Sequence, residues 1–160
     1  MGTMATWRQF EDEAPELAEV ARDRLTATLH HVLATLRADG SPRVSGTEVA
    51  FEGEHLTLGS MPGALKARDL QRDPRYSLHS NPGDGSMTTP DLKVSGRAVE
   101  VVGAEYEAYR SAHAAQLPPG PFHLFRLGLD DVVLAGLNDA RTGMEIRLWR
   151  PGQPVRTFTR

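Results

Sequence analysis

The segment Ser60-Met61-Pro62-Gly63, followed by Lys66 and Arg68, has the residue types needed to bind an anion. It lies where a predicted strand turns into a predicted short helix. A helix N-terminus presents unpaired backbone N–H groups and the positive end of its dipole, and a lysine in the first turn adds a full charge. The pattern favours a phosphate site. The alternative is a turn that uses Gly, Pro and Ser for geometry alone, with solvated basic side chains.

A second candidate stretch is Ser45-Gly46-Thr47, which places small and hydroxyl side chains in a predicted strand. Glycine lets another group approach the backbone closely. Ser45 and Thr47 share one face at the strand period, so they could present hydroxyls to the polar edge of a flat ring. The alternative is a strand end near solvent.

The six histidines do not form a recognisable metal site. His30 and His31 are neighbours in a predicted strand, so their side chains point to opposite faces and cannot share one ion. The remaining four show no close metal-ligand spacing: His55, His79, His113 and His123. We assign no metal, and no side chain stands out as a catalytic acid, base or nucleophile.

Trp149 lies in the segment Trp149-Arg150-Pro151-Gly152 near the C-terminus. A tryptophan at such a position is usually a packing anchor. It could also cover a planar ligand.

Periodicity and turn residues predict the elements that must position these side chains. Asp-Gly in Ala38-Asp39-Gly40-Ser41 predicts a hairpin, and the first three strands form an antiparallel meander in this prediction. The turn-rich segment 81–90 is an exposed loop and a candidate lid. The predicted helices are 14–28, 64–73 and 104–115, and the predicted strands are 29–37, 43–51, 55–59, 75–80, 92–102, 122–137 and 144–149. Six or seven such strands tend to close into a barrel, so the expected class is α+β, mainly β.

The composition of the chain excludes several classes of binding partner. The chain has 160 residues, which suits one domain over 1–160, and a net charge of −3 with no basic stripe, so nucleic acid is not an expected partner. It has no cysteine, which excludes disulfides and thiolate metal sites. Because no apolar run reaches membrane-spanning or signal-peptide length, we expect no membrane association and a cytoplasmic location.

The stretch LATLRADGSPRVSGTEVAFEGEHLTLGSMPGALKARDLQRDPR resembles the core of the pyridoxamine 5′-phosphate oxidase-related proteins. The most specific part is a helix motif carried by Lys66, Asp69, Leu70 and the run Asp73-Pro74-Arg75. With the later strands and the tail, the resemblance covers about Thr6 to the end. It is closest to small members of the family rather than to the vitamin B6 oxidases.

The resemblance implies a Greek-key split β-barrel that forms a homodimer with cofactor sites at the interface. Lys66 would hold the phosphate of FMN, and Arg68 or Arg43 would compensate for an arginine that relatives often carry just before the lysine, where this chain has Ala64 and Leu65. Ser60 and Met61 would lie near the phosphate or ribityl chain, and Trp149 would come from the partner subunit. Ser45, Gly46 and Thr47 would line the ring.

The function implied is an FMN-dependent oxidoreductase acting on a small molecule. One alternative is a reductase that uses the deazaflavin F420, which would need further basic groups for its acidic tail. Another is a non-catalytic module that binds a flavin or haem, and a third is a barrel without cofactor that serves as an interaction protein.

Overall fold

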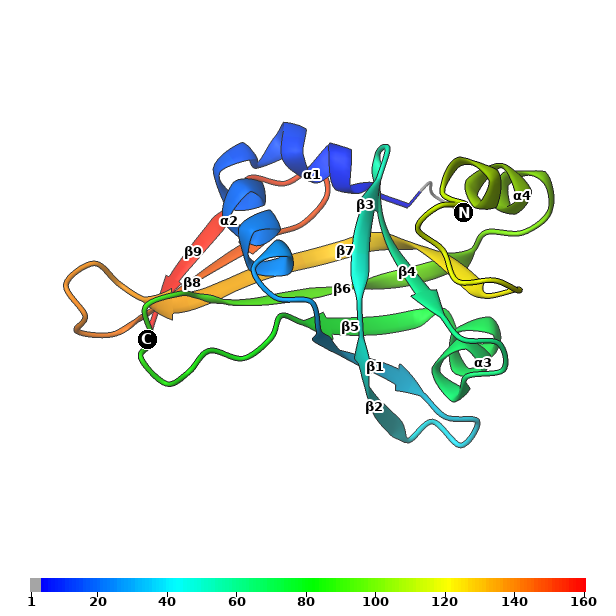
Figure 1. Cartoon of the computed structure of the whole chain (residues 1–160). Coiled ribbons are helices and arrows are strands. Elements are labelled where there is room, and N and C mark those ends of the chain that lie inside the picture. Colours follow the sequence, from blue (N-terminus) through cyan, green and yellow to red (C-terminus); the bar gives the residue numbers. More distant parts are fainter. Residues whose placement is uncertain (1–3) are drawn as a thin grey trace.

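The computed structural model describes residues 4–160, and within them the chain forms nine strands and four helices (Figure 1). The helices are α1 (Trp7–Glu13), α2 (Pro15–Thr26), α3 (Leu65–Arg72) and α4 (Gly103–Ala112). The strands are β1 (His31–Leu36), β2 (Pro42–Thr47), β3 (Val49–Glu52), β4 (His55–Ser60), β5 (Arg75–His79), β6 (Asp91–Glu100), β7 (His123–Leu137), β8 (Met144–Trp149) and β9 (Arg156–Thr159).

All strand pairs are antiparallel, in the order β2-β1-β5-β6-β7-β4-β3. The two ends of this path, β2 and β3, are consecutive in the chain and separated only by Glu48. The sheet must therefore curl until its two edges meet at that residue, which makes a split barrel. Strands β5, β6 and β7 form a meander with β4 beside β7, which is a Greek-key arrangement.

The break at Glu48 corrects the prediction of one strand over 43–51 and of a three-stranded meander. β2 pairs with β1, whereas β3 pairs with β4 at the opposite edge of the sheet. The side-chain pattern of residues 43–51 does not reveal that the two halves of this stretch pair with different strands. The stretch is continuous in sequence, but its first half forms one edge of the sheet and its second half forms the other edge.

Strand β7 has 15 residues and joins the barrel to an arm of the same sheet that consists of β8 and β9. Its first half pairs with β4, and its second half pairs with β8, which in turn pairs with β9. Helices α1 and α2 cover one face of this arm (Figure 1). Phe10 of α1 lies 4.8 Å from Trp149 of β8 between ring centroids, so the helices and the arm share one hydrophobic core.

The long β6–β7 ladder contains a bulge that only glycine allows. The register shifts between Ser95 and Gly96, which leaves Asp130 of β7 unpaired. A Cβ atom on Gly96 would lie 1.9 Å from the carbonyl oxygen of Gly128, closer than any real contact. Bulges of this kind bend a strand and increase its twist, which curved sheets require.

The predicted class, an α+β, mainly β split barrel, is confirmed. Most predicted elements are also present, but the strand count of six or seven was too low, because the strand 43–51 divides and β9 was not predicted. The predicted helix 14–28 is α2, which ends earlier, at Thr26, and α1 was missed. The segment 81–90 is a mostly exposed loop, and its role as a lid stays a prediction. No helix within residues 4–160 is long and apolar enough to cross a membrane.

Candidate functional site

A cleft of about 700 Å³ opens between the β3–β4 hairpin and the segment that links α4 to β7. Strand β4 contributes Thr57 and Gly59, and the turn that follows contributes Met61 and Pro62. The opposite wall is mostly apolar and consists of Tyr109, Gln116, Leu117, Pro118, Pro119, Pro121, Phe122 and Leu124. Its size and lining suit an organic ligand with a flat apolar body.

Ser60 and Met61, both predicted site residues, line this cleft. The Ser60 hydroxyl is buried and has no hydrogen-bond partner among the described residues. A buried hydroxyl without a partner costs free energy, so such a group is usually completed by a ligand or a water. The Met61 side chain is 77% exposed, although methionine is normally a core residue.

Lys66 lies in the first turn of α3, and its Nζ donates a hydrogen bond to the carbonyl oxygen of Gly46 at 2.8 Å. This contact joins two predicted site segments. Burial lowers the pKa of Lys66, and the nearby Glu48 carboxylate partly opposes that shift. Lys66 forms no ion pair within residues 4–160, so its remaining N–H groups can bind an anion.

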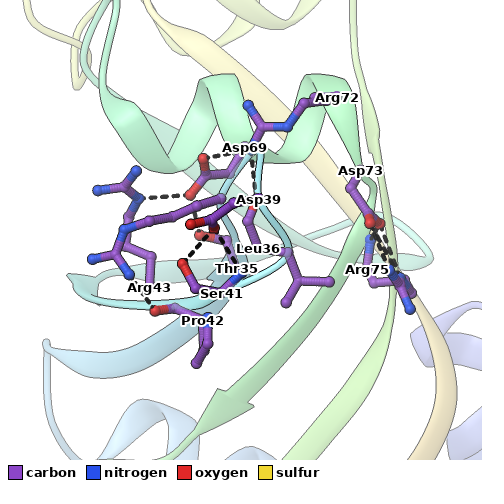
Figure 2. A network of polar contacts seen from close by, with 11 residues as sticks. Thr35, Leu36, Asp39, Ser41, Pro42, Arg43, Asp69, Arg72, Asp73 and Arg75 are labelled. Carbon is purple, nitrogen blue, oxygen red and sulfur yellow. Dashed lines mark hydrogen bonds and ion pairs between the residues drawn. The ribbon is translucent and has the colours of Figure 1, made fainter.

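Asp69, three residues further along α3, orients the helix toward β1 and β2 (Figure 2). Its carboxylate is 2% exposed and accepts hydrogen bonds from Thr35 at 2.8 Å, Arg43 at 2.6 Å and Arg72 at 2.9 Å. Burial raises the pKa of Asp69, but these donors outweigh it and leave the pKa lowered. Asp69 engages the Nε–H of Arg43, and no hydrogen bond of the two Nη groups is present among the described residues. Compensation of the missing arginine by Arg43 stays a prediction.

The other predicted site residues do not line the cleft. Ser45, Gly46 and Thr47 lie on β2, just before Glu48 at the cleft edge, and Thr47 is buried. Ser45 and Thr47 alternate with exposed neighbours, as expected for one face of a strand. Arg68 projects from the exposed side of α3, where it donates to Gln71 at 3.3 Å.

The prediction that Trp149 reaches the cofactor of a partner subunit requires a correction. Its side chain is 0% exposed and packs in the core of its own chain, so it has no surface to offer a cofactor in a partner subunit. Of the two alternatives for this residue, the packing anchor is the one the structure supports.

Several residues around the cleft were not predicted as site residues. They include Glu48 at the junction of β2 and β3, and Tyr109 and Phe122 on the far wall. His123 and Glu100 lie behind the Ser60–Gly63 turn and hold it in place. No local pattern in the sequence shows that the segment 116–121 packs over β4.

The sequence profile described as pyridoxamine 5′-phosphate oxidase matches residues 17–133, which run from α2 into β7 and include the turn after β4. This chain belongs to that family. The predicted family is therefore confirmed. No curated protein matches the chain.

Solved structures support the same fold. A pyridoxamine 5′-phosphate oxidase-related, FMN-binding protein from Nostoc punctiforme is 14% identical with a TM-score of 0.65, over 92% of this chain and 95% of that one. A heme-binding protein from Mycobacterium smegmatis is 22% identical with a TM-score of 0.59, over 89% and 57% of the two chains. A protein of unknown function from Agrobacterium tumefaciens is 26% identical with a TM-score of 0.62, over 82% and 61%. This chain thus spans about three fifths of the last two.

Proposed function

We propose that this protein binds FMN in the cleft beside β4 and uses it as an oxidoreductase of a small-molecule substrate. One observation carries the proposal: the orphaned Ser60 hydroxyl and the half-buried Lys66 ammonium flank the turn between β4 and α3. A hydroxyl and an ammonium on one turn suit a phosphate monoester. The Nostoc relative that binds FMN supports this cofactor class.

A bound flavin would supply the redox chemistry, and the protein would supply orientation and electrostatics. The apolar wall that contains Tyr109 and Phe122 would pack against a flat ring, and Thr57 would offer a polar contact at its edge. The Thr57 hydroxyl already donates to the Ala50 carbonyl at 3.2 Å, so it would meet a ligand as an acceptor. We assign no side chain to proton transfer.

F420 is the less suitable flavin for this cleft. Its acidic tail calls for additional cations near the pocket mouth, but none of the described residues that line the cleft is an arginine or lysine. The charged residue on the lining is Glu48, which would repel such a tail. FMN therefore suits this cleft better than F420 does.

A second candidate function is non-catalytic haem binding. Haem needs an axial ligand, and Met61 and Tyr109 place a thioether and a phenol on the cleft wall. The relative from Mycobacterium smegmatis is a heme-binding protein. Titration with haem, followed by its absorption band, tests this candidate directly.

We further propose that a second copy of the chain completes the cleft in a homodimer. Three apolar side chains beside Lys66 and the cleft turn are exposed: Val44 is 71%, Met61 77% and Leu65 61% accessible. Clustered exposed apolar groups indicate an interaction surface. Light scattering of the purified protein should give twice the mass of the chain, and Leu65→Asp should yield a folded monomer with weakened cofactor binding.

The test of the cofactor is a parallel titration of cofactor-free protein with FMN, F420 and riboflavin, followed by quenching of each ligand's fluorescence. We expect saturable binding of one FMN per chain, tighter than riboflavin because of the phosphate. Reduction of the bound flavin by a donor, and its reoxidation by an added acceptor, would separate an enzyme from a binding module. Binding of neither FMN nor F420 would contradict the proposal.

A further inference from the structure

A chain of hydrogen bonds runs behind the turn that carries Ser60 and Met61. The backbone N–H of Gly63 donates to Nε2 of His123 at 3.2 Å, and Nδ1 of His123 lies 2.9 Å from Glu100. Gln71 of α3 donates to the other oxygen of Glu100 at 2.9 Å. The His123 imidazole therefore connects the turn to β6, and the Glu100 carboxylate extends the connection to α3.

The donor at Gly63 fixes the protonation state of this imidazole. A backbone N–H can only donate, so Nε2 of His123 must accept and carries no proton in this arrangement. The single ring proton is then on Nδ1, where it donates to the Glu100 carboxylate. This accounts for both contacts with a neutral histidine.

Gly63 itself needs this support. Its φ of +73° lies in the left-handed region, and the described part of the chain has no atom within 4 Å of the position of a Cβ. The turn is thus open on its outer side, where Met61, Pro62 and Gly63 are all exposed. His123 is the side chain that anchors its backbone from the inner side.

We propose that His123, oriented by Glu100, is a positioning residue that holds the Ser60–Gly63 turn in its phosphate-binding shape. The inference rests on the proposed binding of a phosphorylated cofactor at this turn. His123 acts through the backbone of Gly63 and does not touch the cofactor. The contact to Gly63 requires the form of the ring in which Nε2 carries no proton.

Protonation would put a second N–H on Nε2, directly opposite the Gly63 N–H. Two donors cannot share a hydrogen bond, so the turn would be released. The charged groups facing the imidazole are Glu100 from β6 and, through Gln71, Arg68 of α3. Glu100 would hold the protonated ring in place while the contact to Gly63 is lost.

Two substitutions separate the two hydrogen bonds of His123. His123→Gln places a carbonyl oxygen where Nε2 accepts, so it keeps the contact to Gly63. His123→Asn places an amide where Nδ1 donates, so it keeps the contact to Glu100 and loses the contact to Gly63. Both variants retain a polar side chain of similar size, so a difference between them does not reflect a cavity.

The first measurement needs no cofactor. Long-range ¹H–¹⁵N spectra of the labelled protein, with His123→Gln used for assignment, should show the Nδ1–H tautomer for His123 at about pH 8. Amide exchange at Gly63 should be faster in His123→Asn than in either wild type or His123→Gln. An Nε2–H tautomer, or equal exchange in both variants, would overturn the inference.

The second measurement is the affinity of FMN relative to riboflavin, which lacks the phosphate. At about pH 8, wild type and His123→Gln should prefer FMN to a similar degree, because both keep the contact to Gly63, and the preference of His123→Asn should be about three- to tenfold weaker. An equal preference in His123→Gln and His123→Asn would refute the inference while leaving the cofactor assignment intact. Failure of the wild type to bind either flavin would instead remove the proposed function, and the phosphate role of His123 with it.

Discussion

The ammonium of Lys66 and the carbonyl oxygen of Gly46 lie 2.8 Å apart, and this contact bridges α3 and the edge strand β2. One N–H of the lysine is thereby fixed, and the side chain is held in a single direction at little entropic cost to a later ligand. The two segments were singled out in the sequence for different reasons, one as a phosphate site and the other as a ring site. Their contact places both segments at one candidate site.

Lys66→Ala should weaken FMN binding by on the order of 1.5–3 kcal/mol, because the charge-assisted bond to phosphate is lost, and should leave riboflavin binding nearly unchanged. Fluorescence titration of both ligands measures the difference. Arg68→Ala is the matched control, since it removes a cation from the exposed side of the same helix. An equal loss in both variants would indicate a general charge effect and contradict a specific role for Lys66.

Asp69→Asn should lower the free energy of unfolding by about 2–4 kcal/mol, because it replaces a buried acceptor of three hydrogen bonds and leaves Arg43 without its counter-charge. Urea denaturation measures the loss. Asp12→Asn, a substitution of an exposed carboxylate on α1, should have almost no effect. A near-neutral Asp69→Asn would mean that α3 is held by other contacts.

The same carboxylate predicts a pH dependence. The pKa of Asp69 is lowered, so the folded state holds its proton less tightly than the unfolded state. The stability that Asp69 contributes is therefore present above the ordinary aspartate pKa of about 4 and is lost as the pH falls through the folded value. Between about pH 5 and pH 3, stability should fall less steeply in Asp69→Asn than in wild type or Asp12→Asn. Equal slopes in all three proteins would contradict this assignment.

The helix that carries Lys66 and Asp69 could be predicted from sequence because its signals are local. Asp73 before Pro74 marks its end, and the Lys-x-x-Asp spacing places both residues on the same side of one short helix. The structure adds what the spacing could not contain: the two side chains reach β2 from α3, Lys66 through Gly46 and Asp69 through Arg43.

The features that the sequence did not predict share a physical cause, because they depend on packing between residues that are far apart in the chain. Glu48 interrupts a stretch with good strand propensity because the sheet curls, and curling is a property of the whole sheet. The contacts of His123 to Gly63 and Glu100 span 60 and 23 residues, so no local pattern could predict them. The helix α1 did leave a local signal, a Thr6 hydroxyl that accepts from the Gln9 N–H as an N-cap, but at seven residues it is stable only through packing.

Gly96→Ala should destabilise the fold by at least about 2 kcal/mol, because its Cβ would collide with the Gly128 carbonyl in the bulge. Gly46→Ala is the matched control in another strand, where the described residues leave the Cβ position open within 4 Å. Thermal unfolding should separate the two variants clearly. If Gly96→Ala unfolds at the same temperature as wild type, β6 and β7 can shift their register without a loss of stability, and the bulge does not depend on glycine.

Gly46→Val should fold normally, since valine suits a strand and the site is open, yet it should weaken flavin binding if the ring lies along β2. FMN and riboflavin should both lose affinity, because the obstruction concerns the ring and not the phosphate. This distinguishes the variant from Lys66→Ala, which affects FMN alone. Wild-type affinity in a well-folded Gly46→Val protein would show that the ring lies deeper in the cleft, against Tyr109 and Phe122.

Trp149→Ala should lower the free energy of unfolding by about 3–5 kcal/mol, because it empties a fully buried position that packs against Phe10. Trp149→Phe retains most of the apolar volume and should cost much less. In conditions where Trp149→Phe is fully folded, its FMN affinity should equal that of wild type, because the indole lies in the core and does not face the cleft. Weakened binding in a folded Trp149→Phe protein would restore a cofactor contact for this residue. Equal binding, together with a large stability loss in Trp149→Ala, establishes it as the link between the α1–α2 layer and the β7–β8 arm.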